Sequence, residues 1–226
     1  MVASTFDLFK IGVGPSSSHT MGPMLAAALF VRRVADSGRL ENVTRLETCL
    51  FGSLALTGKG HATDRAILLG LSGQRPDMIE PDAADLLVDE IRTRSQIILD
   101  GSYEIAFDED RDVIFDQKKR LDFHSNAMRF SAFAGDELID SRVCYSVGGG
   151  AILDEDQIGS NDSDTGLWDV PFPFCSGADL LKITETESLS IADIMRCNEQ
   201  TGKSDAEIGR DIRAIADAMS ACIDRG

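Results

Sequence analysis

The three histidines of this 226-residue chain lie in polar or glycine-rich segments, where an imidazole can reach a ligand. The first stands in a polar run just before an expected helix: Ser16, Ser17, Ser18, His19 and Thr20. Hydroxyls and backbone N–H groups near a helix N-terminus attract negative charge, so this run predicts a cradle for a carboxylate or a phosphate. Helix capping is the alternative interpretation, because serine and threonine also satisfy free N–H groups there. A cap, however, needs only one such residue.

His61 follows the Gly-Lys-Gly segment at residues 58–60 and precedes a short expected helix that Thr63 or Asp64 could cap. An imidazole titrates near neutral pH, which suits a general base that a ligand can reach. A surface histidine in a glycine loop is an equally good interpretation of the same residues.

His124 stands in a third candidate segment, which leads into an expected strand. Arg129 in that strand could anchor a carboxylate, although an arginine on the solvent face of a strand is the commoner case. His124 could also be an ordinary turn residue, with Asn126 in a left-handed conformation. The residues alone leave these alternatives open.

Composition narrows the class of protein. The net charge of −16 and the pI near 4.5 disfavour nucleic acid and anionic membranes as partners, because both repel a negative surface. A local nest of N–H groups can still hold an anionic metabolite. No apolar run could cross a membrane and no leader's apolar core is visible, so we expect a cytoplasmic protein. Scattered cysteines without a C-x-x-C pair indicate reduced thiols: Cys49, Cys144, Cys175, Cys197 and Cys222.

Hydrophobic periodicity predicts an α/β (α+β) fold, with a mixed sheet and packed helices followed by a helical segment. Helices are expected at residues 5–10, 23–37, 64–71, 83–98, 191–198 and 206–223. Strands are expected at residues 43–51, 103–107, 112–115, 127–134 and 138–147, the last two forming a hairpin. Three glycines at residues 148–150 indicate a bulge or a close backbone approach, and residues 154–165 a linker or mobile loop.

Four segments occur together in the order of one family. They are Pro-Ser-Ser-Ser-His-Thr at residues 15–20, Gly-His-Ala-Thr-Asp at 60–64, His-Ser-Asn-Ala-Met-Arg-Phe at 124–130 and Tyr-Ser-Val-Gly-Gly-Gly at 145–150. The chain thereby resembles the N-terminal beta domain of iron–sulfur L-serine dehydratases (L-serine ammonia-lyases) over about residues 4–155. Ser125 departs from the family pattern, which more often has proline there.

The resemblance implies a fold like the allosteric substrate-binding domain of D-3-phosphoglycerate dehydrogenase. It implies a beta domain at residues 1–160, a linker at 161–180, and the helical start of a truncated alpha domain at 181–226. Cysteines of the alpha domain would hold a 4Fe–4S cluster, with no metal ligand in this chain and no pyridoxal phosphate. The expected partners are L-serine, this chain's own alpha domain or a separate alpha subunit, and further copies in a homo-oligomer.

The implied reaction is the conversion of L-serine to pyruvate and ammonia, a step of amino-acid degradation and gluconeogenesis. The resemblance places His61 and His19 in the active site. We expect His61 to be the base, because no hydroxyl cluster surrounds it, and His19 to be the substrate binder within the anion cradle. The expected substrate-binding residues are Ser16, Ser17, Ser18, His19, Thr20, His124, Asn126 and Arg129. A non-catalytic serine-sensing domain is the first alternative. A hydrolase-like Ser–His pair within residues 16–20 ranks last, because adjacent residues rarely face each other and no G-x-S-x-G turn is present.

Overall fold

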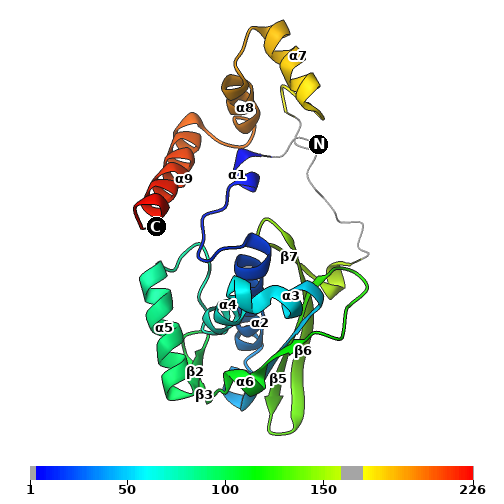
Figure 1. Cartoon of the computed structure of the whole chain (residues 1–226), viewed down its shortest axis with the longest axis vertical. Helices are drawn as coiled ribbons and strands as arrows, with labels where there is room; N and C mark the ends of the chain where they lie inside the picture. The colour runs from blue at the N-terminus through cyan, green and yellow to red at the C-terminus, as the bar shows by residue number, and fades with distance from the viewer. Residues whose placement is uncertain (1–3, 159–169, 226) are drawn as a thin grey trace. The chain divides into compact units, whose positions relative to one another are not determined.

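Two compact units make up the chain, one of Gly12–Gly159 and one of Met1–Ile11 with Ser160–Gly226. The computed structural model describes residues 4–158 and 170–225 (Figure 1). The larger unit holds all three histidines and every predicted site residue. The mixed α/β class predicted from the sequence is confirmed.

A five-stranded sheet forms the centre of the larger unit, in the order β4-β1-β5-β6-β7. Its strands are β1 (Arg45–Phe51), β4 (Val113–Asp116), β5 (Asn126–Ala134), β6 (Glu137–Gly148) and β7 (Ala151–Asp154). β1 and β4 run parallel, whereas the β1–β5, β5–β6 and β6–β7 pairs are antiparallel. The predicted hairpin of the two longest strands is confirmed, with Gly135 at φ 61° in its turn.

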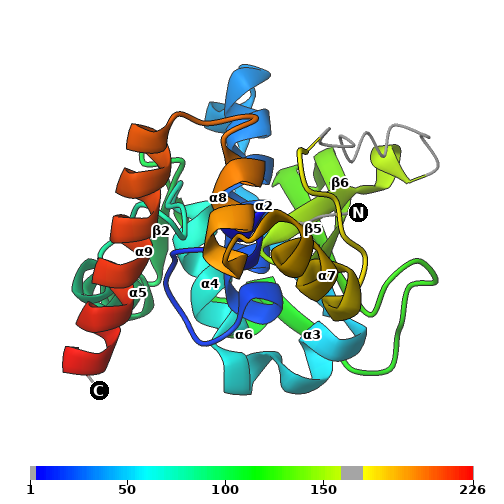
Figure 2. The ribbon, with the colours of Figure 1, turned by 90° about the horizontal axis from the view of Figure 1, so that it is seen from above.

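Helices cover one face of this sheet. α2 (Gly22–Asp36) packs on the sheet, and α4 (Thr63–Leu71) packs beside α2 (Figure 2). Alternate strand residues such as Leu46, Leu50 and Met128 are fully buried against these helices. Gly70 lets α2 and α4 approach closely, because a Cβ there would collide with the carbonyl of Met24.

The predicted helix at residues 83–98 is wrong at its end. α5 (Pro81–Arg94) stops at Ser95, which takes a left-handed φ of 50°. Gln96–Leu99 then forms β2, which pairs with β3 (Tyr103–Ala106) in a separate two-stranded sheet. The apolar run at residues 97–99 fits either period, and pairing with β3 decides for the strand.

The glycines at residues 148–150 form the turn into β7, a strand that the sequence analysis missed. All three have positive φ (109°, 59° and 77°), which favours glycine. The predicted bulge is also present, because the β6–β7 register shifts between Ser146 and Gly148. The predicted linker is wrong at its start, since Asp154 ends β7 and Glu155–Gln157 forms a 3₁₀ turn. Residues 159–165 of that linker lie outside the described residues.

The smaller unit is helical, as predicted for residues 191–198 and 206–223. It contains α7 (Gly177–Glu187), α8 (Ile191–Glu199) and α9 (Asp205–Arg225). The predicted N-terminal helical turn, α1 (Thr5–Leu8), belongs to the same unit. Its backbone N–H at Thr5 donates to the carboxylate of Glu199 over 2.6 Å. None of the described helices has the length and apolar composition needed to cross a membrane.

The remaining short elements connect the longer helices and strands. They are α3 (Gly52–Thr57), the 3₁₀ turns at Leu40–Asn42 and Gly58–His61, the π-helical turn at Ser17–Met21, and α6 (Glu109–Asp112).

Candidate functional site

The polar run at residues 16–20 folds into a turn that leads directly into α2. The side-chain oxygen of Ser16 accepts a hydrogen bond from the backbone N–H of His19 over 3.1 Å. The capping interpretation is therefore confirmed for Ser16. The other residues have different surroundings, with Ser17 exposed, Ser18 and His19 half-buried and Thr20 buried.

The ring of His19 lies between two serine hydroxyls. Ser18 Oγ is 3.0 Å from Nδ1, and Ser53 Oγ is 3.0 Å from Nε2. Burial, and next the neighbouring His61, lower the pKa of His19 below its usual value. The neutral imidazole is thus favoured in the ligand-free protein, because both causes penalise the charged form.

His61 lies beside His19, with 4.9 Å between the ring centroids. Its Nδ1 is 2.9 Å from the carbonyl oxygen of Thr57. A carbonyl only accepts, so Nδ1 carries a proton and a neutral His61 has its lone pair at Nε2. This nitrogen has no hydrogen bond within the described part of the chain.

Two buried threonines tie the histidine segments together. Thr20 donates its hydroxyl to the carbonyl of His61 over 2.7 Å, and Thr63 donates to the carbonyl of His19 over 2.5 Å. The prediction that Thr63 or Asp64 caps the helix after His61 is wrong. The cap is Ala62, which takes a left-handed φ of 54° and makes no side-chain bond.

Ser53 is a site residue that the sequence analysis missed. It follows Gly52, whose φ of 55° turns the chain at the end of β1. A Cβ at Gly52 would collide with the carbonyl of Ser125, and that carbonyl accepts a 2.8 Å hydrogen bond from the N–H of Ser53. The signal in the sequence was a Gly-Ser pair directly after a buried strand.

His124 and Asn126 lie next to Ser53 through this Ser125 contact. The N–H of Asn126 donates to Nδ1 of His124 over 3.1 Å, and its side-chain amide donates to the carbonyl of Ser146 over 3.2 Å. Asn126 begins β5 and does not have a positive φ, so the predicted left-handed turn is wrong. No hydrogen bond joins His124 to either of the other histidines within residues 4–158.

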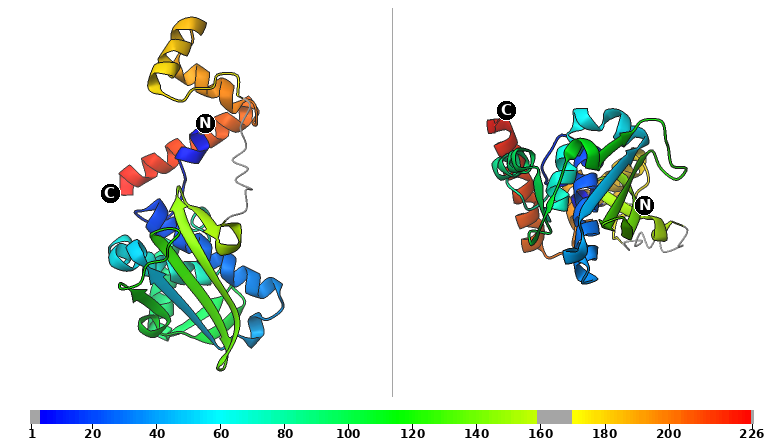
Figure 3. Two further views of the ribbon diagram at one scale, coloured as in Figure 1. Left: turned by 90° about the vertical axis from the view of Figure 1, so that its right-hand side faces the viewer. Right: turned by 90° about the horizontal axis from the view of Figure 1, so that it is seen from below.

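Arg129 lies on the opposite face of the sheet. Successive strand residues point to opposite faces, so Met128 enters the core beneath the helices and Arg129 points away from it. There it lines a cavity of about 410 Å³, with its guanidinium carbon 5.7 Å from the ring centroid of Phe51. Figure 3 (left) looks towards this face, with α2 and α5 behind the sheet. The structure therefore does not bring Arg129 together with the histidines.

Comparison with known proteins identifies the family. The family model described as serine dehydratase beta chain matches residues 4–157. The chain belongs to this family. An L-serine dehydratase of Streptomyces coelicolor is 41% identical, with 100% of this chain and 50% of that protein covered. L-serine dehydratase 2 of Escherichia coli is 40% identical, with 99% and 49% covered. This beta chain thus spans about half the length of the curated relatives it matches.

The two cysteines of the larger unit do not lie together. Cys49 and Cys144 are buried on opposite faces of the sheet. Within residues 4–158 and 170–225, no group of three or more His, Cys, Asp or Glu side chains could hold a metal ion. These residues do not fit the 4Fe–4S cluster that the sequence resemblance implies.

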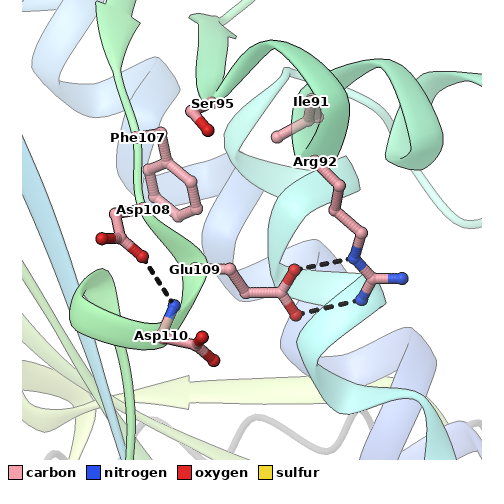
Figure 4. Close-up of a pocket in the computed structure, with 7 residues that line it drawn as sticks. All are labelled: Ile91, Arg92, Ser95, Phe107, Asp108, Glu109 and Asp110. Atoms are coloured by element: carbon pink, nitrogen blue, oxygen red, sulfur yellow. Dashed lines mark hydrogen bonds and ion pairs between the residues drawn. The ribbon is translucent and has the colours of Figure 1, made fainter.

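A further cavity, of about 320 Å³, lies between α5 and α6 of the beta chain (Figure 4). Its main cation, Arg92, already forms a bidentate ion pair with Glu109 at 2.7 and 3.0 Å. None of the predicted site residues lines it. The histidine cluster, made of Ser18, His19, Ser53, Thr57 and His61, is therefore the better candidate site.

Proposed function

We propose that this chain supplies substrate-binding and acid–base residues to an L-serine ammonia-lyase, which converts L-serine to pyruvate and ammonia. One observation carries the proposal most directly. His61 donates from Nδ1 to the Thr57 carbonyl, which leaves Nε2 as the basic atom beside the hydroxyl-rich turn at residues 16–20. The serine dehydratase names of the relatives supply the reaction class.

Loss of water from serine requires removal of the Cα proton and departure of the β-hydroxyl. His61 takes the Cα proton at Nε2, since a general base must be neutral and accessible before the reaction. Its Nδ1–H stays on the Thr57 carbonyl and stabilises the imidazolium that forms. Release of aminoacrylate and its hydrolysis to pyruvate then need no further group of this chain.

The turn at residues 16–20 binds the carboxylate or ammonium of the substrate through hydroxyls and amides. His19 contributes to binding rather than to proton abstraction. Both of its ring nitrogens face serine hydroxyls, so neither is free to take the Cα proton. His124 is an accessory residue near Ser53, and Asn126, which bonds to it, stays a predicted substrate contact. Arg129 stays a predicted substrate contact, although it lies on the other face of the sheet.

Other parts of the proposal rest on the family resemblance. They are the 4Fe–4S cluster as the electrophile for the leaving hydroxyl, its cysteine ligands in an alpha domain or subunit, and the absence of pyridoxal phosphate. The homo-oligomer, the likeness to the D-3-phosphoglycerate dehydrogenase domain and the division at residues 1–160, 161–180 and 181–226 belong with them.

The test is alanine substitution of each histidine in the assembled enzyme, meaning this chain with its cluster-bearing partner. His61→Ala should lower kcat roughly 10²- to 10⁴-fold, as expected for a lost general base, without loss of cluster content. His19→Ala should mainly raise KM. If His61→Ala keeps a near-normal kcat and His19→Ala loses it, the two roles must be exchanged. If neither substitution changes kcat although L-serine still binds, the serine-sensing alternative is favoured.

A further inference from the structure

His19 is held at both ring nitrogens by hydroxyl groups. Ser18 Oγ and Ser53 Oγ are each 3.0 Å from their nitrogen. Neither hydroxyl has a further hydrogen-bond partner within the described residues. Because a neutral imidazole has one N–H, one nitrogen donates and the other accepts.

Two arrangements satisfy this geometry. In the first, Nε2–H donates to Ser53 Oγ and Ser18 donates to Nδ1, so the hydroxyl proton of Ser53 is free. In the second, Ser53 donates to Nε2 and Nδ1–H donates to Ser18, so the hydroxyl proton of Ser18 is free. Exchange between the two moves one proton from one ring nitrogen to the other through solvent and leaves the total unchanged.

Ser53 is placed to connect all three histidine segments. Its hydroxyl contacts His19, and its N–H donates to the carbonyl of Ser125, next to His124. Its carbonyl accepts from the hydroxyl of Thr57, whose own carbonyl holds His61. The hydroxyl of Ser18, in contrast, has a partner only in its own turn.

We infer that Ser53 is a further substrate-binding residue, whose hydroxyl donates to the substrate carboxylate while His19 donates Nε2–H to Ser53 Oγ. This inference rests on the proposed function and changes how His19 takes part in it. His19 becomes a positioning residue, because it fixes the direction of the Ser53 hydroxyl instead of touching the substrate. A carboxylate beside Ser53 selects the first arrangement, since only there is the Ser53 proton available.

The chemistry of His19 agrees with this role. Burial and His61 lower its pKa, which keeps the ring neutral near pH 7. A neutral ring has a tautomer to select, whereas an imidazolium would donate to both serines. In that case the hydroxyl protons of Ser18 and Ser53 would both be free, and Ser53 would have no special role.

The experiment measures L-serine binding and the His19 tautomer in the 226-residue chain. Calorimetry gives the Kd, and ¹⁵N NMR of the imidazole shows which nitrogen carries the proton. We expect L-serine to shift His19 to the Nε2–H form. Ser53→Ala should raise the Kd about 10- to 100-fold, the range for losing a hydrogen bond to a charged group. Ser53→Thr, which retains a hydroxyl, should keep both the affinity and the tautomer shift.

Ser125→Ala is the matched control, since it removes an exposed neighbouring hydroxyl but keeps the backbone contact to Ser53. It should leave the tautomer shift intact.

An unchanged Kd in Ser53→Ala, or a shift to Nδ1–H in the wild-type chain, would overturn the inference. The wild-type tautomer needs no substitution, so the inference stays testable if Ser53→Ala fails to fold. If L-serine does not bind the wild-type chain, this inference fails, whereas kinetics of the assembled enzyme still test the proposed function. If L-serine binds but Ser53 has no effect, only this inference fails.

Discussion

The histidine cluster and the cavity around Arg129 are two separate regions of the larger unit. The segment from Asn126 to Arg129 leads from the neighbourhood of Ser53 to the outer cavity, because β5 turns alternate side chains to opposite faces. Asn126 bonds to Ser146 and His124, whereas Arg129 lies over Phe51. A motif along a strand is therefore not one site until each residue is assigned to a face of the sheet.

The two regions also differ in how their polar groups are satisfied. In the histidine cluster, buried Thr20 and Thr63 fix the backbone at both histidines, and His19 has a hydroxyl at each ring nitrogen. On the other face, Lys119 and Arg129 lie 5.4 and 5.7 Å from the Phe51 ring and form no ion pair within the described residues. In the first region hydrogen bonds fix the polar groups, whereas the second presents cations on an aromatic surface.

The largest expected effect comes from the residue that turns the chain into the histidine cluster. Gly52→Ala should lower the free energy of unfolding by about 2–5 kcal/mol, combining about 1–2 for a left-handed φ with about 1–3 for overpacking against the Ser125 carbonyl. Urea unfolding measures this loss. Ser53 and His19 should lose their contact in the same variant.

Gly135→Ala is the matched control for Gly52→Ala. Gly135 has a similar φ of 61°, but a Cβ there would meet nothing within 4 Å. Gly135→Ala should therefore lower the free energy of unfolding by only about 1–2 kcal/mol, the cost of a left-handed φ for alanine. Equal losses of unfolding free energy in the two variants would show that the Ser125 carbonyl adds no overpacking cost at position 52.

A smaller effect is expected when the two regions are compared through the kcat/KM of variants in each. In the assembled enzyme, Ser18→Ala should lower kcat/KM about 10- to 100-fold, through loss of one hydrogen bond worth about 1.5–3 kcal/mol in the turn that we propose to bind substrate. Ser17→Ala tests the exposed neighbour in the same way. Unchanged kinetics with lower stability in both variants would favour a purely structural turn.

Arg129→Ala is the counterpart on the other face. Its distance from the histidines leads us to expect a much smaller change in kcat/KM than in Ser18→Ala, even though the family motif contains it. A rise in KM as large as that of Ser18→Ala would show that the outer cavity takes part in substrate binding. Steady-state kinetics on both variants decides between these outcomes.

Local patterns predicted most of the elements of this fold. α2, β1, β5 and α9 are each at least seven residues long, so their apolar patterns are visible in a local window. Prediction was wrong where a short apolar run fits both periods, as at residues 96–99, and β7 was missed because only four residues follow the glycine turn. In both cases a partner strand decides the structure, and that partner is not visible in a local window.

The site was predictable in its residues and less so in its contacts. Hydroxyls around His19 indicated hydrogen bonding, but Ser53 lies 34 positions away in sequence and meets His19 only through the fold. Likewise, the Thr20 and Thr63 bonds between the histidine segments depend on how α2 and α4 pack. Side-chain type predicts what a residue can bond, whereas its partner follows from tertiary structure.

The two buried cysteines offer a chemical probe of the two faces. Burial raises the pKa of Cys144, in the core beneath the helices, to about 12, and also raises the pKa of Cys49 on the outer face. Since the thiolate is the reactive form, alkylation at mildly alkaline pH should be slowest at Cys144 and faster at Cys49. Exposed Cys222 serves as the internal standard. Faster labelling at Cys144 than at Cys49 would contradict this order.

The smallest expected effect is the pH dependence that His19 gives to stability. Burial first, and His61 second, lower the pKa of folded His19 below its usual value of 6.5, so the unfolded chain binds this proton more readily. Stability is therefore greatest above about pH 6.5 and falls as the pH drops through that value towards the folded pKa, the reverse of a histidine with an anionic partner. Urea midpoints of wild type and His19→Gln at about pH 7.5 and about pH 5.5 measure this loss, and carboxylate titration cancels in the comparison. Wild type should lose more stability than His19→Gln over this interval. An equal loss in both proteins would mean that burial in the cluster does not disfavour the charged ring. An outer-face variant such as Arg129→Gln is the control, and its stability should depend on pH as that of the wild type does.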